Sequence, residues 1–114
     1  GVTAVLDRAF EALANPHRRE IVARLADGPL TTPELGRAFD MSKQALSRHV
    51  HVLESAGFVT RRPHGRVHEL RLEPQPLDDI AAWTDLRRAA WERNLDRLDA
   101  VLTDTADPNQ ETDR

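Results

Sequence analysis

The spacing of apolar residues predicts two amphipathic helices at the start of the chain. Apolar side chains recur every three or four positions from residue 2 to residue 13, which is typical of one buried helix face. Asn15 and Pro16 then open a second helix, because Asn is a favoured cap and Pro fits the first helical turn. The sequence Asp-Gly-Pro at residues 27–29 ends this second helix.

Two further helices follow with a short break between them. Thr32 is the expected cap of a short helix that reaches about Phe39, with Pro33 in its first turn. Ser42 caps a longer helix, which Gly57 closes. The residues of this longer helix that should face inward are Leu46, Val50 and Leu53.

The second half of the chain changes from an extended to a helical pattern. Residues 58–63 and 66–72 are two short extended runs joined at His64 and Gly65, which predicts a β-hairpin. A long last helix follows Pro76 and reaches Leu102, with a broad apolar side. Residues 103–114 lack an apolar pattern and are expected to form a flexible acidic tail.

These elements predict a mainly α fold with a small β-hairpin. Five helices and a two-stranded wing, in this order, are typical of a winged helix-turn-helix. Residues 1–102 should form a single domain, since 114 residues are too few for two ordinary ones.

Composition and charge narrow the function further. No apolar run approaches the roughly 20 residues that cross a bilayer, and no secretory signal is visible, so a cytoplasmic protein without a membrane role is expected. The net charge is -3, but Ser42–Arg71 carries six basic and two acidic residues, whereas Leu77–Arg114 carries ten acidic and five basic ones. This local basic segment favours contact with nucleic-acid phosphates.

The fourth helix and the hairpin hold the candidate DNA-binding residues. With the apolar positions turned inward, the outer side of the helix presents side chains that suit base edges in the major groove. Arg48 can bind guanine with two hydrogen bonds, Gln44 can pair with adenine, and Ser47 lets the helix approach closely. The helix amides near Ser42 can bind a phosphate. The full predicted set is Ser42, Lys43, Gln44, Ser47, Arg48 and His51 on the helix, and Arg61, Arg62, His64 and Arg66 on the wing.

Spaced motifs along residues 5–102 closely resemble the ArsR/SmtB family of arsenic-type repressors. They comprise the run Ala12–Ile21, then Leu25, Gly28, Thr31, Glu34-Leu35, Met41-Ser42, Leu46–Val50, Leu53-Glu54, Ala56-Gly57 and Val59. The resemblance implies a homodimer built from the first and last helices, with two recognition helices on a pseudo-palindromic operator in double-stranded DNA.

The dimer implied by this resemblance should use the apolar stripes of the first and last helices. The predicted interface residues are Val5, Ala9, Leu13, Trp83, Trp91, Leu95, Leu98 and Leu102. The two tryptophans suit either this interface or a ligand pocket.

The chain departs from the metal-sensing members of the family. Those members use a Cys-x-Cys motif or His and carboxylate ligands on the last helix, whereas this chain has no cysteine and no histidine after His68. Neither site is present, so no metal and no cofactor is predicted, and any small-molecule effector stays unknown.

The sequence therefore predicts a transcriptional repressor and not an enzyme, since no nucleophile motif or glycine-rich phosphate loop occurs. Two alternatives stay open: a winged helix used for protein interaction, and a repressor with an effector site in the dimer interface. His17, Arg18 and Arg19 suit either phosphate contact or an exposed cluster. His49 suits either a structural hydrogen bond or a phosphate contact.

Overall fold

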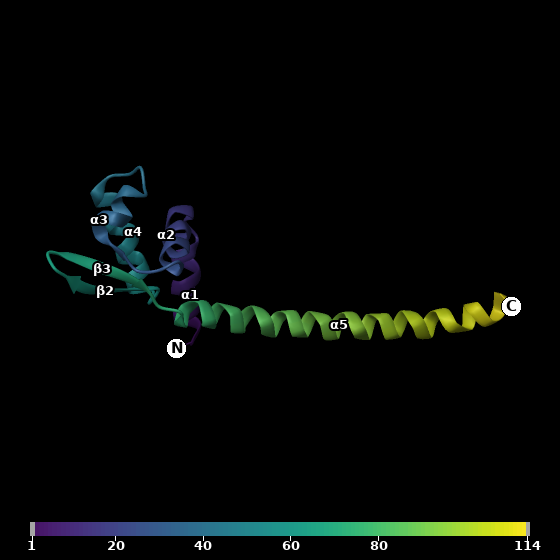
Figure 1. Cartoon of the computed structure of the whole chain (residues 1–114). Coiled ribbons are helices and arrows are strands. Elements are labelled where there is room, and N and C mark those ends of the chain that lie inside the picture. Colours follow the sequence, from purple (N-terminus) through teal and green to yellow (C-terminus); the bar gives the residue numbers. More distant parts are fainter. Residues whose placement is uncertain (1, 114) are drawn as a thin grey trace. The chain divides into compact units, whose positions relative to one another are not determined.

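The computed structural model describes the backbone of residues 2–113 and the side chains of residues 3–104. The chain divides into two compact units, Gly1–Ile80 and Ala81–Arg114. The first unit contains four helices, three strands and the start of the last helix, and the second contains the rest of that helix (Figure 1). The predicted winged helix-turn-helix is confirmed.

The five helices are α1 (Val2–Leu13), α2 (Pro16–Ala26), α3 (Thr32–Arg37), α4 (Lys43–Ser55) and α5 (Gln75–Asp113). Asn15 caps α2 as predicted, because its side-chain oxygen accepts hydrogen bonds from the backbone amides of His17 and Arg18 at 2.8 and 3.3 Å. Ser42 caps α4 as predicted, since its hydroxyl accepts from the amide of Ala45 at 3.1 Å.

The cap of α3 differs from the prediction by one residue. Thr31, and not Thr32, is the cap, and α3 ends at Arg37 before Phe39 is reached. The amide of Glu34 donates to the Thr31 hydroxyl at 3.3 Å, while the Thr31 amide donates to the Glu34 carboxylate at 2.8 Å. This reciprocal capping box needs Glu or Gln three positions after the cap, a condition that Thr31 meets with Glu34 and Thr32 does not.

The sheet has three strands where the sequence predicts two. The antiparallel order is β1 (Leu30–Thr31), β3 (Val67–Leu72) and β2 (Val59–His64). β1 pairs Leu30 with Leu70, and a strand of two residues is too short to show alternation in the sequence. The hairpin closes between the paired residues His64 and Val67, where Gly65 has the positive φ of 65° that such a turn favours.

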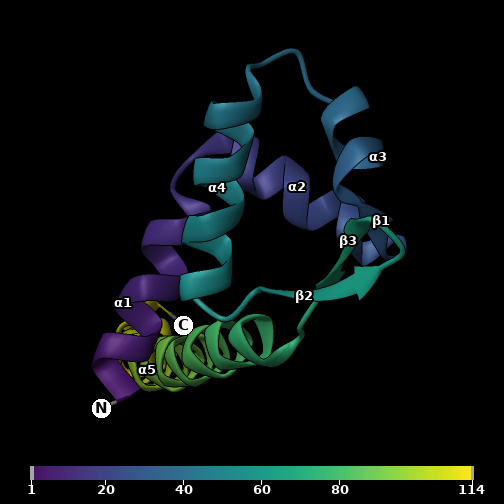
Figure 2. The ribbon, with the colours of Figure 1, turned by 90° about the vertical axis from the view of Figure 1, so that its left-hand side faces the viewer.

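The core of the first unit contains side chains from α4 and from the helices and strands around it. The largest fully buried side chains are Ile21, Leu35, Leu53, Phe58 and Leu70, which come from α2, α3, α4, the segment before β2, and β3. Figure 2 shows α4 and α3 leaving a common loop, with α2 and the sheet beside them. Because its inner side contributes to this core, α4 keeps its opposite side exposed.

One residue predicted for the dimer face belongs to this core instead. Ala9 is fully buried within the chain, and Leu13 packs against the same cluster, whereas Val5 is exposed. Most of the predicted α1 positions therefore pack within the chain, because α1 packs on α2 and α4. The sequence pattern shows that a face is apolar but not which partner covers it.

The last helix begins at Gln75, slightly earlier than predicted, with Pro76 still in its first turn. Its backbone is helical through Asp113, where the sequence predicts a tail from residue 103. The side chains of residues 105–114 lie outside the described part, so the flexible tail stays a prediction. Within the described residues, no helix is long and apolar enough to cross a membrane.

Candidate DNA-binding surface

The outer side of α4 carries the predicted reading residues. Lys43, Gln44, Ser47, Arg48 and His51 are all exposed. On the inner side Val50 and Leu53 are buried and Leu46 is half-buried, which confirms the predicted division of this helix. Helical spacing thus places the five polar side chains on a face that the core does not use.

The first turn of α4 adds backbone donors to this face. The Ser42 hydroxyl is engaged with the amide of Ala45, which leaves the amides of Lys43 and Gln44 without an acceptor inside the helix. Free amides at a helix N-terminus attract an anion, and the helix dipole adds to this attraction. The cap and the side chain of Lys43 therefore suit the same phosphate.

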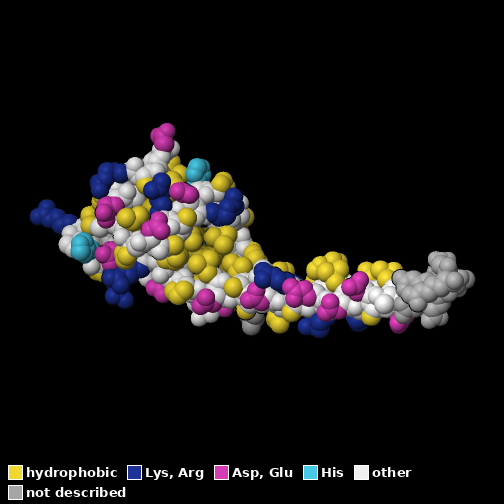
Figure 3. Space-filling view, turned by 45° about the vertical axis from the view of Figure 1, so that its right-hand side comes forward, with side chains coloured by type: hydrophobic (Ala, Val, Ile, Leu, Met, Phe, Trp, Pro, Cys, Tyr) yellow, Lys and Arg dark blue, Asp and Glu magenta, His cyan; other side chains and the backbone are white. Residues whose placement is uncertain are grey.

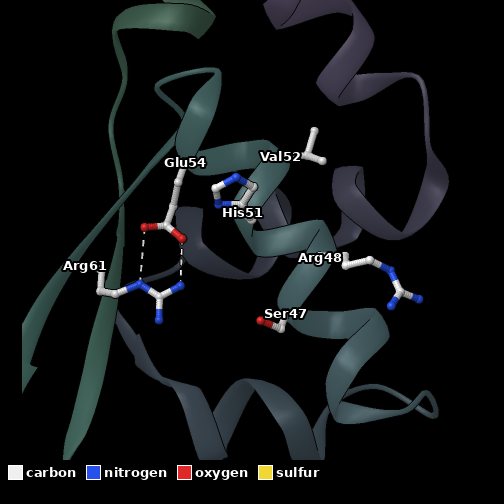
Figure 4. Close-up of a pocket in the computed structure, with 6 residues that line it drawn as sticks. All are labelled: Ser47, Arg48, His51, Val52, Glu54 and Arg61. Carbon is white, nitrogen blue, oxygen red and sulfur yellow. Dashed lines mark hydrogen bonds and ion pairs between the residues drawn. The ribbon is translucent and has the colours of Figure 1, made fainter.

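Arg61 on the wing is held in an ion pair within the chain. Its guanidinium donates two hydrogen bonds to the carboxylate of Glu54 on α4, at 2.6 and 3.2 Å. Figure 4 shows this pair bridging β2 and α4, with Arg48 pointing away from it. Arg61 thus ties the wing to the recognition helix, a role that sequence reasoning missed because Glu54 lies on another element.

Ion pairs occupy both acidic residues of the basic segment and leave its other cations exposed. Its two acidic residues are both neutralised by neighbours, Glu54 by Arg61 and Glu69 by Arg71 at 2.9 Å. Among the described side chains, no ion pair engages the four other cations, which are Lys43, Arg48, Arg62 and Arg66. These four cations lie on α4 and on the hairpin, where Arg62, His64 and Arg66 are exposed.

A hollow of about 470 Å³ lies on the surface between α4 and β2. The side chains that line it are Ser47, Arg48, His51, Val52, Glu54 and Arg61, drawn in Figure 4. The structure thus brings Ser47, Arg48 and His51 together on one surface, whereas the wing-tip residues lie apart from it on the hairpin.

The arginines at the start of α2 have a structural role. Arg18 donates to the carbonyl groups of Ala12 and Glu11 at 2.7 and 3.1 Å, and Arg19 donates to that of Leu13 at 2.8 Å. These carbonyl groups lie in the last turn of α1, where carbonyls lack an amide donor within the helix, and that of Glu11 also accepts from the amide of Ala14 at 3.1 Å. These hydrogen bonds give both arginines a structural role that neither alternative from the sequence included, and a phosphate contact by this cluster stays a prediction.

His49 joins the same network from the inner edge of α4. Its Nδ1 atom lies 3.3 Å from Arg18 Nη1. A guanidinium only donates, so this contact is a hydrogen bond only for the neutral ring that accepts at Nδ1 and carries its proton on Nε2. Burial, followed by the charges of Arg18, His17 and Arg48, lowers the pKa of His49 below its usual value of 6.5. The structural interpretation of His49 thus fits the geometry.

The other predicted dimer residues lie on α5. Trp91, Leu95, Leu98 and Leu102 are exposed, and Figure 3 shows hydrophobic clusters along this helix between charged side chains. The guanidinium of Arg87 stacks 4.5 Å from the ring centre of Trp83. In the part of the chain with described side chains, no group of three or more His, Asp or Glu residues is placed to hold a metal.

The order of elements, the capped recognition helix and the basic hairpin define a winged helix-turn-helix protein of the DNA-binding class. Comparison with known proteins agrees with this class. Residues 13–62 match a family model described as a helix-turn-helix domain.

Curated and solved relatives specify the family. The HTH-type transcriptional regulator Rv2034 of Mycobacterium tuberculosis is 46% identical over 89 residues, which cover 78% of this chain and 80% of the relative. The arsenical resistance operon repressor of Escherichia coli is 30% identical over 102 residues, which cover 88% of this chain and 84% of the relative. A solved ArsR family transcriptional regulator, RHA00566, is 36% identical with a TM-score of 0.75, covering 79% of this chain and 93% of that one.

The chain therefore belongs to the ArsR family of winged helix-turn-helix transcriptional regulators. Its members are DNA-binding regulators and not enzymes, in agreement with the prediction from sequence.

The contact between His49 and Arg18 predicts a dependence of stability on pH. Because the folded pKa of His49 is lowered, the unfolded chain binds more protons, and the stabilisation present above the unfolded pKa of about 6.5 is lost as pH falls toward the folded pKa. We expect the urea midpoint to fall between pH 7.5 and pH 5, and to fall less in His49→Gln.

His51→Gln is the matched control, since His51 lies exposed on the same helix. Its urea midpoint should follow that of the unmodified protein over the whole pH range. An equal pH slope in His49→Gln and the unmodified protein would show that the His49 contact does not couple folding to protonation.

Proposed function

We propose that this regulator is a sequence-specific repressor that binds a pseudo-palindromic operator as a homodimer. The observation that carries the proposal is the outer surface of α4, which presents Gln44, Ser47 and Arg48 beside unpaired cations. An Arg side chain without a protein partner keeps its fork available for guanine, and Gln44 can pair with adenine. Occupation of the operator would exclude RNA polymerase, and the cytoplasm is the compartment in which such a bacterial repressor acts.

The wing supplies affinity in this proposal, and the recognition helix supplies discrimination. Arg62, His64 and Arg66 are exposed on the hairpin and suit the phosphate backbone, which carries no sequence information. Arg61 is held by Glu54 and fixes the angle of the hairpin instead. We therefore expect Arg61 to contribute less to DNA binding than Arg62 and Arg66.

The outer face of α4 also weighs against a protein-interaction module. Such a module would need an apolar anchor at the centre of its contact surface. This face is polar and cationic instead, with Lys43 at its N-terminal end, Arg48 near its middle and no exposed large apolar residue on α4.

Dimerisation through α5 follows from the exposure of its apolar stripe. Trp91, Leu95, Leu98 and Leu102 are spaced four, three and four apart and are 59%, 43%, 53% and 57% exposed. The unit from Ala81 onward is a single helix, so it offers these side chains no second element to pack on. Pairing with a second copy would bury them and present two recognition helices, each to one half-site.

One prediction of this proposal separates base reading from phosphate contact. Arg48→Ala should weaken binding to a duplex selected from a random pool by about 1 to 3 kcal/mol and reduce its preference over a scrambled duplex. Arg62→Ala should weaken both duplexes equally, because a phosphate contact is independent of sequence. Fluorescence anisotropy at fixed salt measures both affinities. An unchanged preference in Arg48→Ala would contradict the assignment of α4 as the reading helix.

Another prediction of this proposal concerns the α5 interface. Leu95→Glu should convert the dimer into monomers, because the interface would bury an unpaired charge, and operator binding should fall with it. Ala100→Glu adds the same charge on the opposite side of the helix, where an exposed residue already lies, and should stay dimeric. Analytical ultracentrifugation measures both variants. A Leu95→Glu protein that still sediments as a dimer excludes this interface.

A further inference from the structure

A groove of about 990 Å³ lies between α3, α4 and the sheet, within the first unit. Its floor reaches core residues, since Leu35, Val50 and Leu70 line it and each is at least nine-tenths buried on its own. Leu46 and Val67 form half-buried walls. The groove is within the size range of sites that hold small organic ligands in proteins, about 300 to 1,000 Å³.

The charged residues that line the groove are all cationic. Arg37 of α3, Lys43 and Arg48 of α4 and Arg61 of β2 line it, and no Asp or Glu does. Arg61 is already paired with Glu54, but no ion pair engages Arg37, Lys43 or Arg48 among the described side chains. A ligand that fits this groove therefore needs two features. It needs a negative charge near the three cations and an apolar part that covers the floor.

A DNA strand meets only one of these requirements. Its phosphates can neutralise Lys43 and Arg48, but a charged sugar-phosphate backbone is a poor match for an apolar floor formed by Leu35 and Leu70. A small molecule with one anionic head and an apolar chain meets both, since the chain is removed from water while the head binds the rim.

We propose that this groove binds a medium-chain carboxylate, with its chain over Leu35, Leu46 and Leu70 and its head on Arg37 and Lys43. The bound head would neutralise Lys43 and occupy space next to Gln44 and thus oppose DNA binding. Ligand binding itself does not depend on the proposed function, whereas its effect on DNA rests on that function.

Octanoate is the probe, and acetate and octylammonium are the matched ligands that lack the chain or reverse the charge. Calorimetric titration of the full chain should show saturable binding of one octanoate per protomer and no binding of either control. In amide NMR spectra, the shifts should concentrate on Leu35, Gly36 and Val67. No saturable binding, or shifts confined to the apolar stripe of α5, would overturn the proposal.

Two variants locate the site independently. Arg37→Gln should weaken octanoate about tenfold by removing a charge-assisted hydrogen bond, while Arg8→Gln on α1 should change nothing. Gly36→Leu should abolish binding, because Gly36 lines the groove and a Cβ added there meets Leu46 Cδ2 at an ordinary contact distance of 3.9 Å, so the larger side chain starts into the groove without a clash at its first atom. Equal affinities in Arg37→Gln and Arg8→Gln would refute the site even if Gly36→Leu fails to fold.

The last arm tests the effect on DNA with the duplex selected from a random pool. Octanoate should release this duplex from the unmodified protein and fail to release it from Gly36→Leu. If the protein binds no duplex with sequence preference, the proposed function fails while the titration still decides the ligand site. If octanoate binds in the groove and leaves DNA affinity unchanged, the opposition between ligand and DNA is excluded.

Discussion

The packing of one side of α4 into the core is the constraint on which the rest of the molecule depends. Val50 and Leu53 meet Leu35, Phe58 and Leu70 there, so helices, strands and loop share one buried cluster. Burial of each such side chain is worth about 1.5 to 3 kcal/mol, which fixes the rotation of the helix about its axis. Since side chains three and four apart share a face, fixing the buried side also fixes which residues face outward.

Polar contacts then set the position of the wing relative to this helix. Arg61 binds Glu54 with two hydrogen bonds, and the amide of Glu73 donates to the carbonyl of Phe58 at 2.8 Å. The first contact joins the hairpin to α4, and the second joins the two ends of the hairpin. The basic segment holds more cations than acids, so the charge left after its two ion pairs is positive, although the whole chain carries a net charge of -3.

Local patterns predicted most of the fold and most of the candidate surface. Caps at Asn15 and Ser42, the apolar side of α4 and the glycine of the hairpin are each encoded within a few residues, so the sequence shows them directly. Contacts between distant residues were missed for the opposite reason. Strand β1 exists only through its pairing with β3, and the partners of Arg18 and Arg61 lie on other helices. Ala9 would fit the apolar stripe of α1 whether that stripe faced the core or a second copy of the chain. Only the packing of α1 shows that Ala9 is buried within the chain.

The central claim is that α4 reads DNA sequence in two copies related by a two-fold axis. Hydroxyl-radical footprinting of the full chain on a duplex selected from a random pool tests this claim most directly. The account predicts two protected patches on one face of the duplex, with inverted sequence and centres about one helical turn apart, roughly 34 Å. A single protected patch, or protection that is the same on a scrambled duplex, would contradict it.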